Sequence, residues 1–263
     1  MTEEHRANPL GEKEHSMSED TRVGLKVLAL GQKMESSEGM KVYRRLANLR
    51  RGFEIVVLNY KSLRDQLASF SNPEVAIPLL DRNHPERMQV FWLSTLRHLN
   101  NYLWATRALR YQVDRSSKKE MDERLIRMYG EQMRRVSDSP LWEFVIDLSD
   151  FCMHRDIPPI GSTLKFEGPG HETTTDLVLN VKLLLESDSW RAKSKEYLKG
   201  AGSEIRLLEM TDEHFKLIAG LFTWFHDQVI EAHKSELKEL EELQEEMDKL
   251  DRRAFPDPRK PSS

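Results

Sequence analysis

Cysteine is almost absent from this sequence, which contains only Cys152. The chain therefore cannot form an intrachain disulfide or hold a metal ion with several thiolates. A reducing compartment fits this usage, and we expect a cytoplasmic protein. No apolar run approaches the roughly 20 residues that a membrane helix needs. Residues 1–20 lack the apolar centre of a signal peptide, so the sequence predicts no membrane association.

Apolar residues are also scarce. The 263 residues are 38% hydrophobic and 32% charged. Long helices produce this balance, because a helix needs only one apolar stripe to reach the core. A chain of this length buries roughly 70% of its unfolded surface, so it needs no metal or disulfide for stability. The net charge of −4 does not point to nucleic acid or membrane. We expect an all-α helical bundle.

Apolar residues at steps of three and four predict four helices between residues 40 and 155. The four are expected at residues 40–70, 85–113, 118–136 and 142–155. Asn72 and Pro73 end the first helix, because proline disfavours helix in the residue before it. A loop is expected to continue through Pro78.

The helical pattern is interrupted by a predicted β-hairpin at about residues 161–181. Two short β-prone runs, at residues 163–167 and 173–181, flank Gly168-Pro169-Gly170. The glycines do not follow a strand and open a helix, so they form no phosphate-binding loop. A short helix over residues 190–199 is expected to follow.

A long final helix is predicted from an N-cap at Thr211 to Leu250. Its last part is acidic and carries a leucine stripe, which favours either pairing with a second chain as a coiled coil or folding back on its own domain. The sequence leaves open whether translation starts at Met1 or at Met17. The expected organisation is a disordered leader at residues 1–20, the bundle at 21–235, a projecting acidic helix at 236–251 and a disordered tail at 252–263.

One segment carries a family resemblance. Residues 141–161 read LWEFVIDLSDFCMHRDIPPIG, a helix with an aromatic residue and a histidine before a proline-containing break. This pattern resembles the Leu-Arg-Asn-Tyr-x-x-His helix end of uncharacterised bacterial HEPN-like helical bundles. The resemblance places the family's histidine on His154 and its aromatic residue on Phe151. The family's arginine position falls on Ser149, and the polar position after it falls on Asp150.

The resemblance implies a function that depends on those two departures. HEPN domains that cleave RNA pair an arginine with a histidine, and their dimers bring two pairs together. Imidazole can move the ribose hydroxyl proton, and guanidinium can hold the phosphate. Ser149 carries no charge, and Asp150 would repel a phosphate. We therefore expect a non-catalytic, homodimeric binding or regulatory relative, in the stress or defence settings where such domains often occur.

Two other functions stay open. The first is a metal-independent ribonuclease with His154 as acid or base and an arginine supplied by Arg155, Arg97 or a partner chain. The second is a structural or partner-recruiting protein that acts through its C-terminal helix. A purely structural interpretation of His154 and Arg155 is that both stabilise the C-terminal end of their helix. Cys152 is expected to be a small buried residue rather than a nucleophile.

Basic residues are concentrated between Arg107 and Arg135, close to Trp104 and Tyr111. Cations and aromatic rings on one face would bind RNA through phosphates and stacked bases. Acidic residues interleave with them, and a solvated helix surface with intrahelical pairs gives the same pattern. The partners left open are thus RNA or a protein. No Walker sequence or paired-carboxylate helix motif occurs, so we expect no cofactor and no metal.

Overall fold

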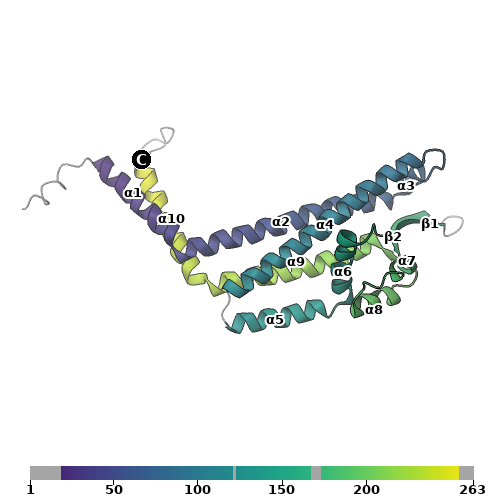
Figure 1. Cartoon of the computed structure of the whole chain (residues 1–263). Helices are drawn as coiled ribbons and strands as arrows, with labels where there is room; N and C mark the ends of the chain where they lie inside the picture. The colour runs from purple at the N-terminus through teal and green to yellow at the C-terminus, as the bar shows by residue number, and fades with distance from the viewer. Residues whose placement is uncertain (1–18, 121–122, 167–172, 255–263) are drawn as a thin grey trace, which may run out of the picture. The chain divides into compact units, whose positions relative to one another are not determined.

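The computed structural model describes residues 19–120, 123–166 and 173–254. It is mostly helical with one small antiparallel sheet, which confirms the predicted helical protein with a hairpin (Figure 1). The helices are α1 Glu19–Ser36, α2 Glu38–Phe70, α3 Pro73–Leu79, α4 Pro85–Glu120, α5 Glu123–Ser137, α6 Pro140–His154, α7 Val181–Leu185, α8 Ala192–Gly200, α9 Leu207–Ala232 and α10 Lys234–Ala254. The strands are β1 Ile160–Phe166, β2 Thr173–Asn180 and β3 Glu204–Arg206.

The chain divides into two compact units. The terminal unit comprises residues 1–47 and 230–263, and the central unit comprises residues 48–229. The division falls inside α2 and α9, so each of these helices contributes to both units. Of the features expected from the sequence, most of the leader, most of the tail and the Gly168-Pro169-Gly170 turn lie outside the described residues.

In the terminal unit, α1 packs against α10. Leu30 of α1 and Leu243 of α10 are both buried. A Cβ on Gly31 would lie 3.4 Å from the terminal methyl of Met247, so the two helices approach closely. The leucine stripe of α10 therefore has a packing partner within the same chain.

In the central unit, the aromatic residues of α2 and α9 stack in pairs. The ring centroids of Phe53 and Phe222 are 4.3 Å apart, and those of Tyr60 and Phe215 are 3.8 Å apart. Both pairs are nearly parallel, at 8° and 3°. Stacked rings of this kind bury a large apolar area and fix the register of the two helices.

The three strands form a sheet in the order β1-β2-β3, with antiparallel pairing throughout. Ile160 lies opposite Leu179 in the hairpin, and Ile205 pairs with Leu179 from the other edge. The buried hydroxyl of Thr175 donates a hydrogen bond to the carbonyl oxygen of Phe70. This bond ties the sheet to the C-terminal end of α2.

Two expectations about helix boundaries before the hairpin were wrong. Residues 73–79 form α3 instead of a loop, because the Asn72 side chain accepts a hydrogen bond from the Glu74 backbone and Pro73 fits a first helical turn. The helix expected to end near Val113 continues as α4 to Glu120, so Lys118 belongs to α4 rather than to the next helix.

The final helix also differs from expectation. It begins at Leu207, and Thr211 is a fully buried residue inside α9 rather than an N-cap. A turn at His233 divides the predicted single helix into α9 and α10. Burial of Leu207 and Met210 on the core side explains why the helix starts one turn earlier.

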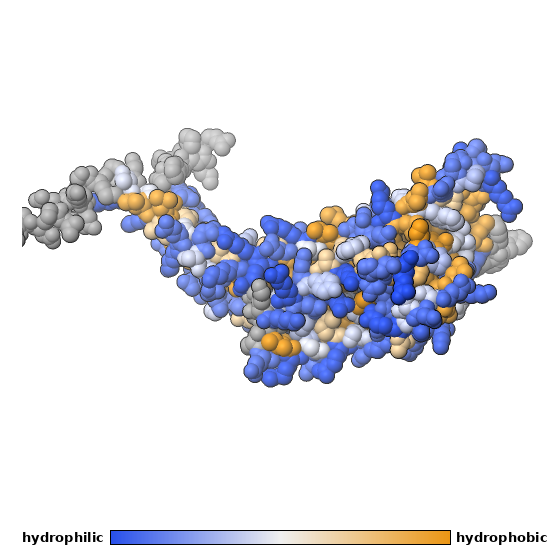
Figure 2. All heavy atoms as spheres, in the orientation of Figure 1, coloured by the Kyte–Doolittle hydropathy of each residue, from blue (hydrophilic) through white to orange (hydrophobic). Residues whose placement is uncertain are grey.

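Most of the surface in Figure 2 is hydrophilic, with apolar residues gathered over α3 and the start of α4. The exposed large apolar side chains of these two elements include Val75, Ile77, Val90 and Leu93. No helix in the described ranges is long and apolar enough to cross a membrane.

Candidate functional site

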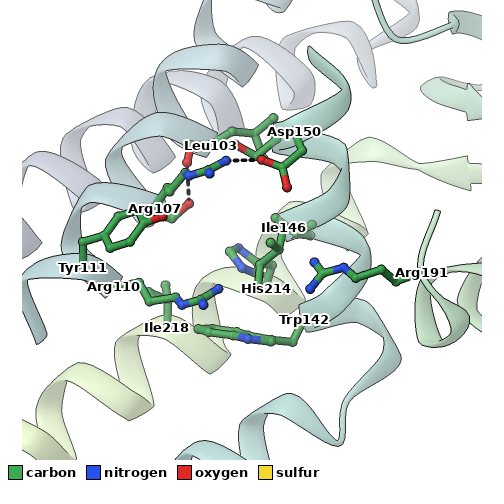
Figure 3. Close-up of a pocket in the computed structure, with 13 residues that line it drawn as sticks. Leu103, Arg107, Arg110, Tyr111, Trp142, Ile146, Asp150, Arg191, His214 and Ile218 are labelled. Atoms are coloured by element: carbon green, nitrogen blue, oxygen red, sulfur yellow. Dashed lines mark hydrogen bonds and ion pairs between the residues drawn. The ribbon is translucent and has the colours of Figure 1, made fainter. Parts of the chain in front are cut away.

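A cavity of about 220 Å³ lies between α4, α6 and α9, with the residue before α8 at its edge. Its lining combines buried apolar residues with arginines, as the close-up in Figure 3 shows. The lining residues are Leu103, Thr106, Arg107, Arg110, Tyr111, Trp142, Val145, Ile146, Ser149, Asp150, Arg191, His214 and Ile218. All of them belong to the central unit.

The floor of the cavity is apolar. Leu103, Val145 and Ile218 are each 2% exposed, and Trp142 is 4% exposed. Each lies on the apolar, core-facing stripe of its helix. Amphipathic helices pack with these stripes together, so the floor lies where α4, α6 and α9 meet. A ligand in this position would meet hydrocarbon and indole surface below its polar contacts.

The rim of the cavity is cationic. Arg107 forms an ion pair with Asp150, and its guanidinium carbon lies 5.9 Å from the centre of the Tyr111 ring. Hydrogen bonding to Asp150 raises the pKa of Arg107 above its ordinary value. The ion pair that Arg110 makes among the described residues is a long one, 3.8 Å from its Nε to the Asp114 carboxylate. The charge of Arg110 is therefore less compensated than that of Arg107.

Arg191 is held at the opposite edge by the buried carboxylate of Asp147. That carboxylate accepts hydrogen bonds from the backbone N–H of Arg191 at 2.8 Å, from its Nε at 2.5 Å and from the Ser194 hydroxyl at 2.6 Å. The preceding residue, Trp190, stacks on Phe151 with ring centroids 5.4 Å apart. In Figure 3, the guanidinium groups of Arg110 and Arg191 point toward one another.

His214 forms a neutral wall of the cavity. It is 3% exposed, and burial lowers its pKa to about 3. Its Nδ1 lies 2.7 Å from the hydroxyl of Tyr102, whose pKa burial raises well above the ordinary value. The phenol keeps its proton and donates a hydrogen bond to Nδ1. The imidazole therefore carries its own proton on Nε2. His214 therefore adds no positive charge near neutral pH.

Ser149 lines the cavity with a buried hydroxyl. The residue is 4% exposed, and its Oγ has no hydrogen-bond partner among the residues that the structure describes. A buried polar group without a partner costs about 1–3 kcal/mol. A ligand group that reached this hydroxyl would remove that cost.

The residues expected from the family resemblance divide between two places. Ser149 and Asp150 line the cavity. His154 is exposed at the end of α6 and lines a second hollow, of about 420 Å³. Arg107 and Tyr111 line both. The second hollow is completed by Asn100, Trp104, Cys152 and Met153.

The other candidates from the sequence lie apart from this group. Arg155 is the exposed C-cap residue of α6, and Arg97 contacts His98. Neither lines the hollow that contains His154. Burial raises the pKa of Cys152 to about 12, so its thiol stays protonated and is no nucleophile near neutral pH. Within the described ranges, no group of three or more histidine, cysteine or acidic residues could hold a metal ion.

Sequence reasoning did not find Arg191 or His214. His214 had a detectable signal, because it stands at steps of four between the buried Met210 and Ile218 and thus occupies a core position of α9. Arg191 had none. Its position depends on the contact between its own loop and Asp147, which is 44 residues away in the chain.

Comparisons of the chain with protein-family models, curated proteins and solved structures find no match.

Proposed function

We propose that this chain is a non-catalytic, HEPN-like helical bundle that binds a small ligand in the cavity between α4, α6 and α9 and acts as a regulatory protein. The observation that supports this proposal is the cavity itself, which combines a buried apolar floor with two arginines that point toward one another. Binding sites for small molecules typically have this composition, with many apolar residues and a few convergent polar groups.

The chemical state of the lining supports binding rather than catalysis. Ser149 stands where the family pattern has its arginine, and His214 is neutral because burial lowers its pKa to about 3. A general base needs a pKa near the working pH, which His214 does not have. Asp150 and Arg107 are engaged with each other. The cavity thus offers contacts for a ligand but no activated nucleophile.

The proposal is tested by thermal stability in the presence of a panel of small metabolites. At least one compound should raise the melting temperature of the wild-type chain, because a ligand that binds only the folded state stabilises it. Ser149→Leu should abolish this increase by filling the cavity. Thr174→Leu, at an exposed position on β2, should not. A panel that stabilises both variants equally would place binding elsewhere.

A ribonuclease is the second candidate function, because Arg107 and His154 line the same hollow. Arg107 could supply the cation that Ser149 lacks, although its pairing with Asp150 opposes that role. The experiment compares RNA cleavage by the wild-type chain, His154→Ala and Arg107→Gln, each checked for folding. The binding proposal expects no cleavage by any of them. Cleavage lost in both variants would establish the nuclease instead.

We also propose that the chain forms a homodimer through the surface around the second hollow. Trp104 and Tyr111 are 57% and 61% exposed there, and exposed aromatic residues are frequent in interfaces. The mass in solution at tens of micromolar should be that of a dimer, and Trp104→Ala should shift it toward the monomer. A wild-type chain that is monomeric at this concentration contradicts the proposal.

A further inference from the structure

We infer that the ligand of the cavity is a small carboxylic acid with one ring, bound with its carboxylate between Arg110 and Arg191 and its ring on the apolar floor. This inference rests on the function proposed above and names the chemical class of the ligand. It follows from three observations: the weak ion pair of Arg110 at the rim, the size and composition of the cavity, and the hydroxyl of Ser149, which has no hydrogen-bond partner in the described residues.

Of the three arginines at the rim, Arg110 has the longest ion pair among the described residues, at 3.8 Å. Arg107 is engaged by Asp150. Arg191 is bound by Asp147 and lies 3.3 Å from the Glu143 carboxylate. The guanidinium of Arg110 is paired weakly, since its only ion pair in the described residues is the long one to Asp114.

Together, Arg110 and the remaining N–H groups of Arg191 provide donors for a single carboxylate. Planar guanidinium groups suit planar carboxylates, which they bind through paired N–H donors. A phosphate dianion would bring a second negative charge close to Asp147, Glu143 and Asp150, which lie at or beside the same rim. The carboxylate is therefore favoured over the phosphate.

The size of the cavity fits one ring. Its volume is about 220 Å³. An apolar cavity of about 150 Å³ holds benzene, whereas pockets for drug-sized ligands span about 300–1,000 Å³. The ring centroid of Trp142, in the floor, lies 5.6 Å from that of His214, in the wall, so the two form an aromatic corner of the cavity. An aromatic ring packed here gains both apolar burial and ring–ring contact.

Ser149 completes the polar contacts. Its Oγ is buried in the lining and has no hydrogen-bond partner in the described ranges. This hydroxyl can donate a hydrogen bond to a carboxylate oxygen. Binding would thus give this hydroxyl a partner that the described residues do not provide.

The test titrates the full chain with benzoate, benzamide and phenyl phosphate by isothermal calorimetry. Benzoate is the carboxylate probe, benzamide has the same shape without charge, and phenyl phosphate is the alternative anion. We expect benzoate to bind at least tenfold more tightly than benzamide and more tightly than phenyl phosphate. Raising the salt concentration should weaken benzoate binding, because its main contacts are ionic.

Two variants and a matched control assign the contacts. Arg110→Gln should weaken benzoate binding at least tenfold. Arg115→Gln, an exposed change on the same helix outside the cavity lining, should leave it unchanged. Ser149→Ala should weaken binding several-fold without lowering the melting temperature of the ligand-free chain, because the hydroxyl that it removes has no hydrogen-bond partner among the described residues. A residue with a merely structural role would show the opposite pattern.

Each contrary outcome is informative. Equal binding of benzoate and benzamide overturns the inference but leaves the cavity as a ligand site. Tighter binding of phenyl phosphate replaces the carboxylate by a phosphate. If no probe binds, the inference is wrong, and the metabolite panel then decides whether the proposed function survives. Benzoate binding that Arg110→Gln leaves unchanged would place the acid outside this cavity.

Discussion

Asp147→Asn tests how the loop before α8 is held. The Asp147 carboxylate accepts three hydrogen bonds, two from Arg191 and one from Ser194. The asparagine side chain would keep one acceptor oxygen and present an NH₂ group to donors, so at least one buried donor would lose its partner. Ser194 is fully buried, with 0% exposure, and cannot turn to water. Because a hydrogen bond to a charged group contributes about 1.5–3 kcal/mol, we expect the free energy of unfolding to fall by about 2–4 kcal/mol.

The assay is urea unfolding followed by tryptophan fluorescence. All five tryptophans lie in residues 48–229, so the signal reports the central unit. With an m-value of about 2–3 kcal/mol/M, the midpoint should fall by about 1 M. Asp138→Asn is the matched control. Its side chain is 77% exposed and pairs with Lys193, two residues beyond Arg191. An exposed pair contributes about 0–1 kcal/mol. Equal midpoints for the two variants would refute the buried-carboxylate argument.

Three further predictions concern packing and protonation. Gly39→Ala should cost about 1–3 kcal/mol, because its Cβ would lie 2.1 Å from a backbone oxygen of α10. Gly31→Ala, the matched control, should be neutral or stabilising. Hydrogen exchange of the α10 amides measures the difference in stability between the two variants. Burial holds the pKa of His214 at about 3, below its ordinary 6.5, so the unfolded chain takes up a proton that the folded chain does not as the pH falls. The free energy of unfolding should therefore fall by about 2 kcal/mol more between pH 7 and pH 5 in the wild-type chain than in His214→Gln, as urea titrations at both pH values would show. Thr175→Val should cost about 1–2 kcal/mol in the same urea assay, whereas the exposed Thr174→Val should cost less than about 0.5 kcal/mol.

The elements that the sequence predicted well are those whose signal is local. The apolar steps of α2 and α6 continue over several turns, and Pro140 marks the start of α6. β1 and β2 are β-prone runs that flank Gly168-Pro169-Gly170 in the sequence. α1 and β3 lack such a signal. α1 packs on α10. β3 is a three-residue strand that pairs with the edge of β2. Their structure depends on partners distant in the sequence.

The site was harder to predict than the fold, because its residues converge from four separate segments. The basic stretch contained Arg107 and Arg110, but its spacing could not show that Asp150 engages the first and leaves the second more free. The family resemblance places Ser149, Asp150 and His154 in one motif near the end of α6, and thus predicts a single site. The helix instead directs Ser149 and Asp150 to the cavity and His154 to the second hollow, because successive residues turn by about 100° around the axis.

The small size of Ser149 is what connects the sequence resemblance with the cavity in our proposal. Ser149 is a small residue in the wall of a cavity of about 220 Å³, with only 4% of its surface exposed. An arginine at this position would extend into that volume and would add a fourth positive charge to a lining that already contains Arg107, Arg110 and Arg191. A buried charge without its own partner is strongly destabilising. In the function that we propose, the small side chain of Ser149 leaves the space for a ligand, which is why we favour binding over RNA cleavage.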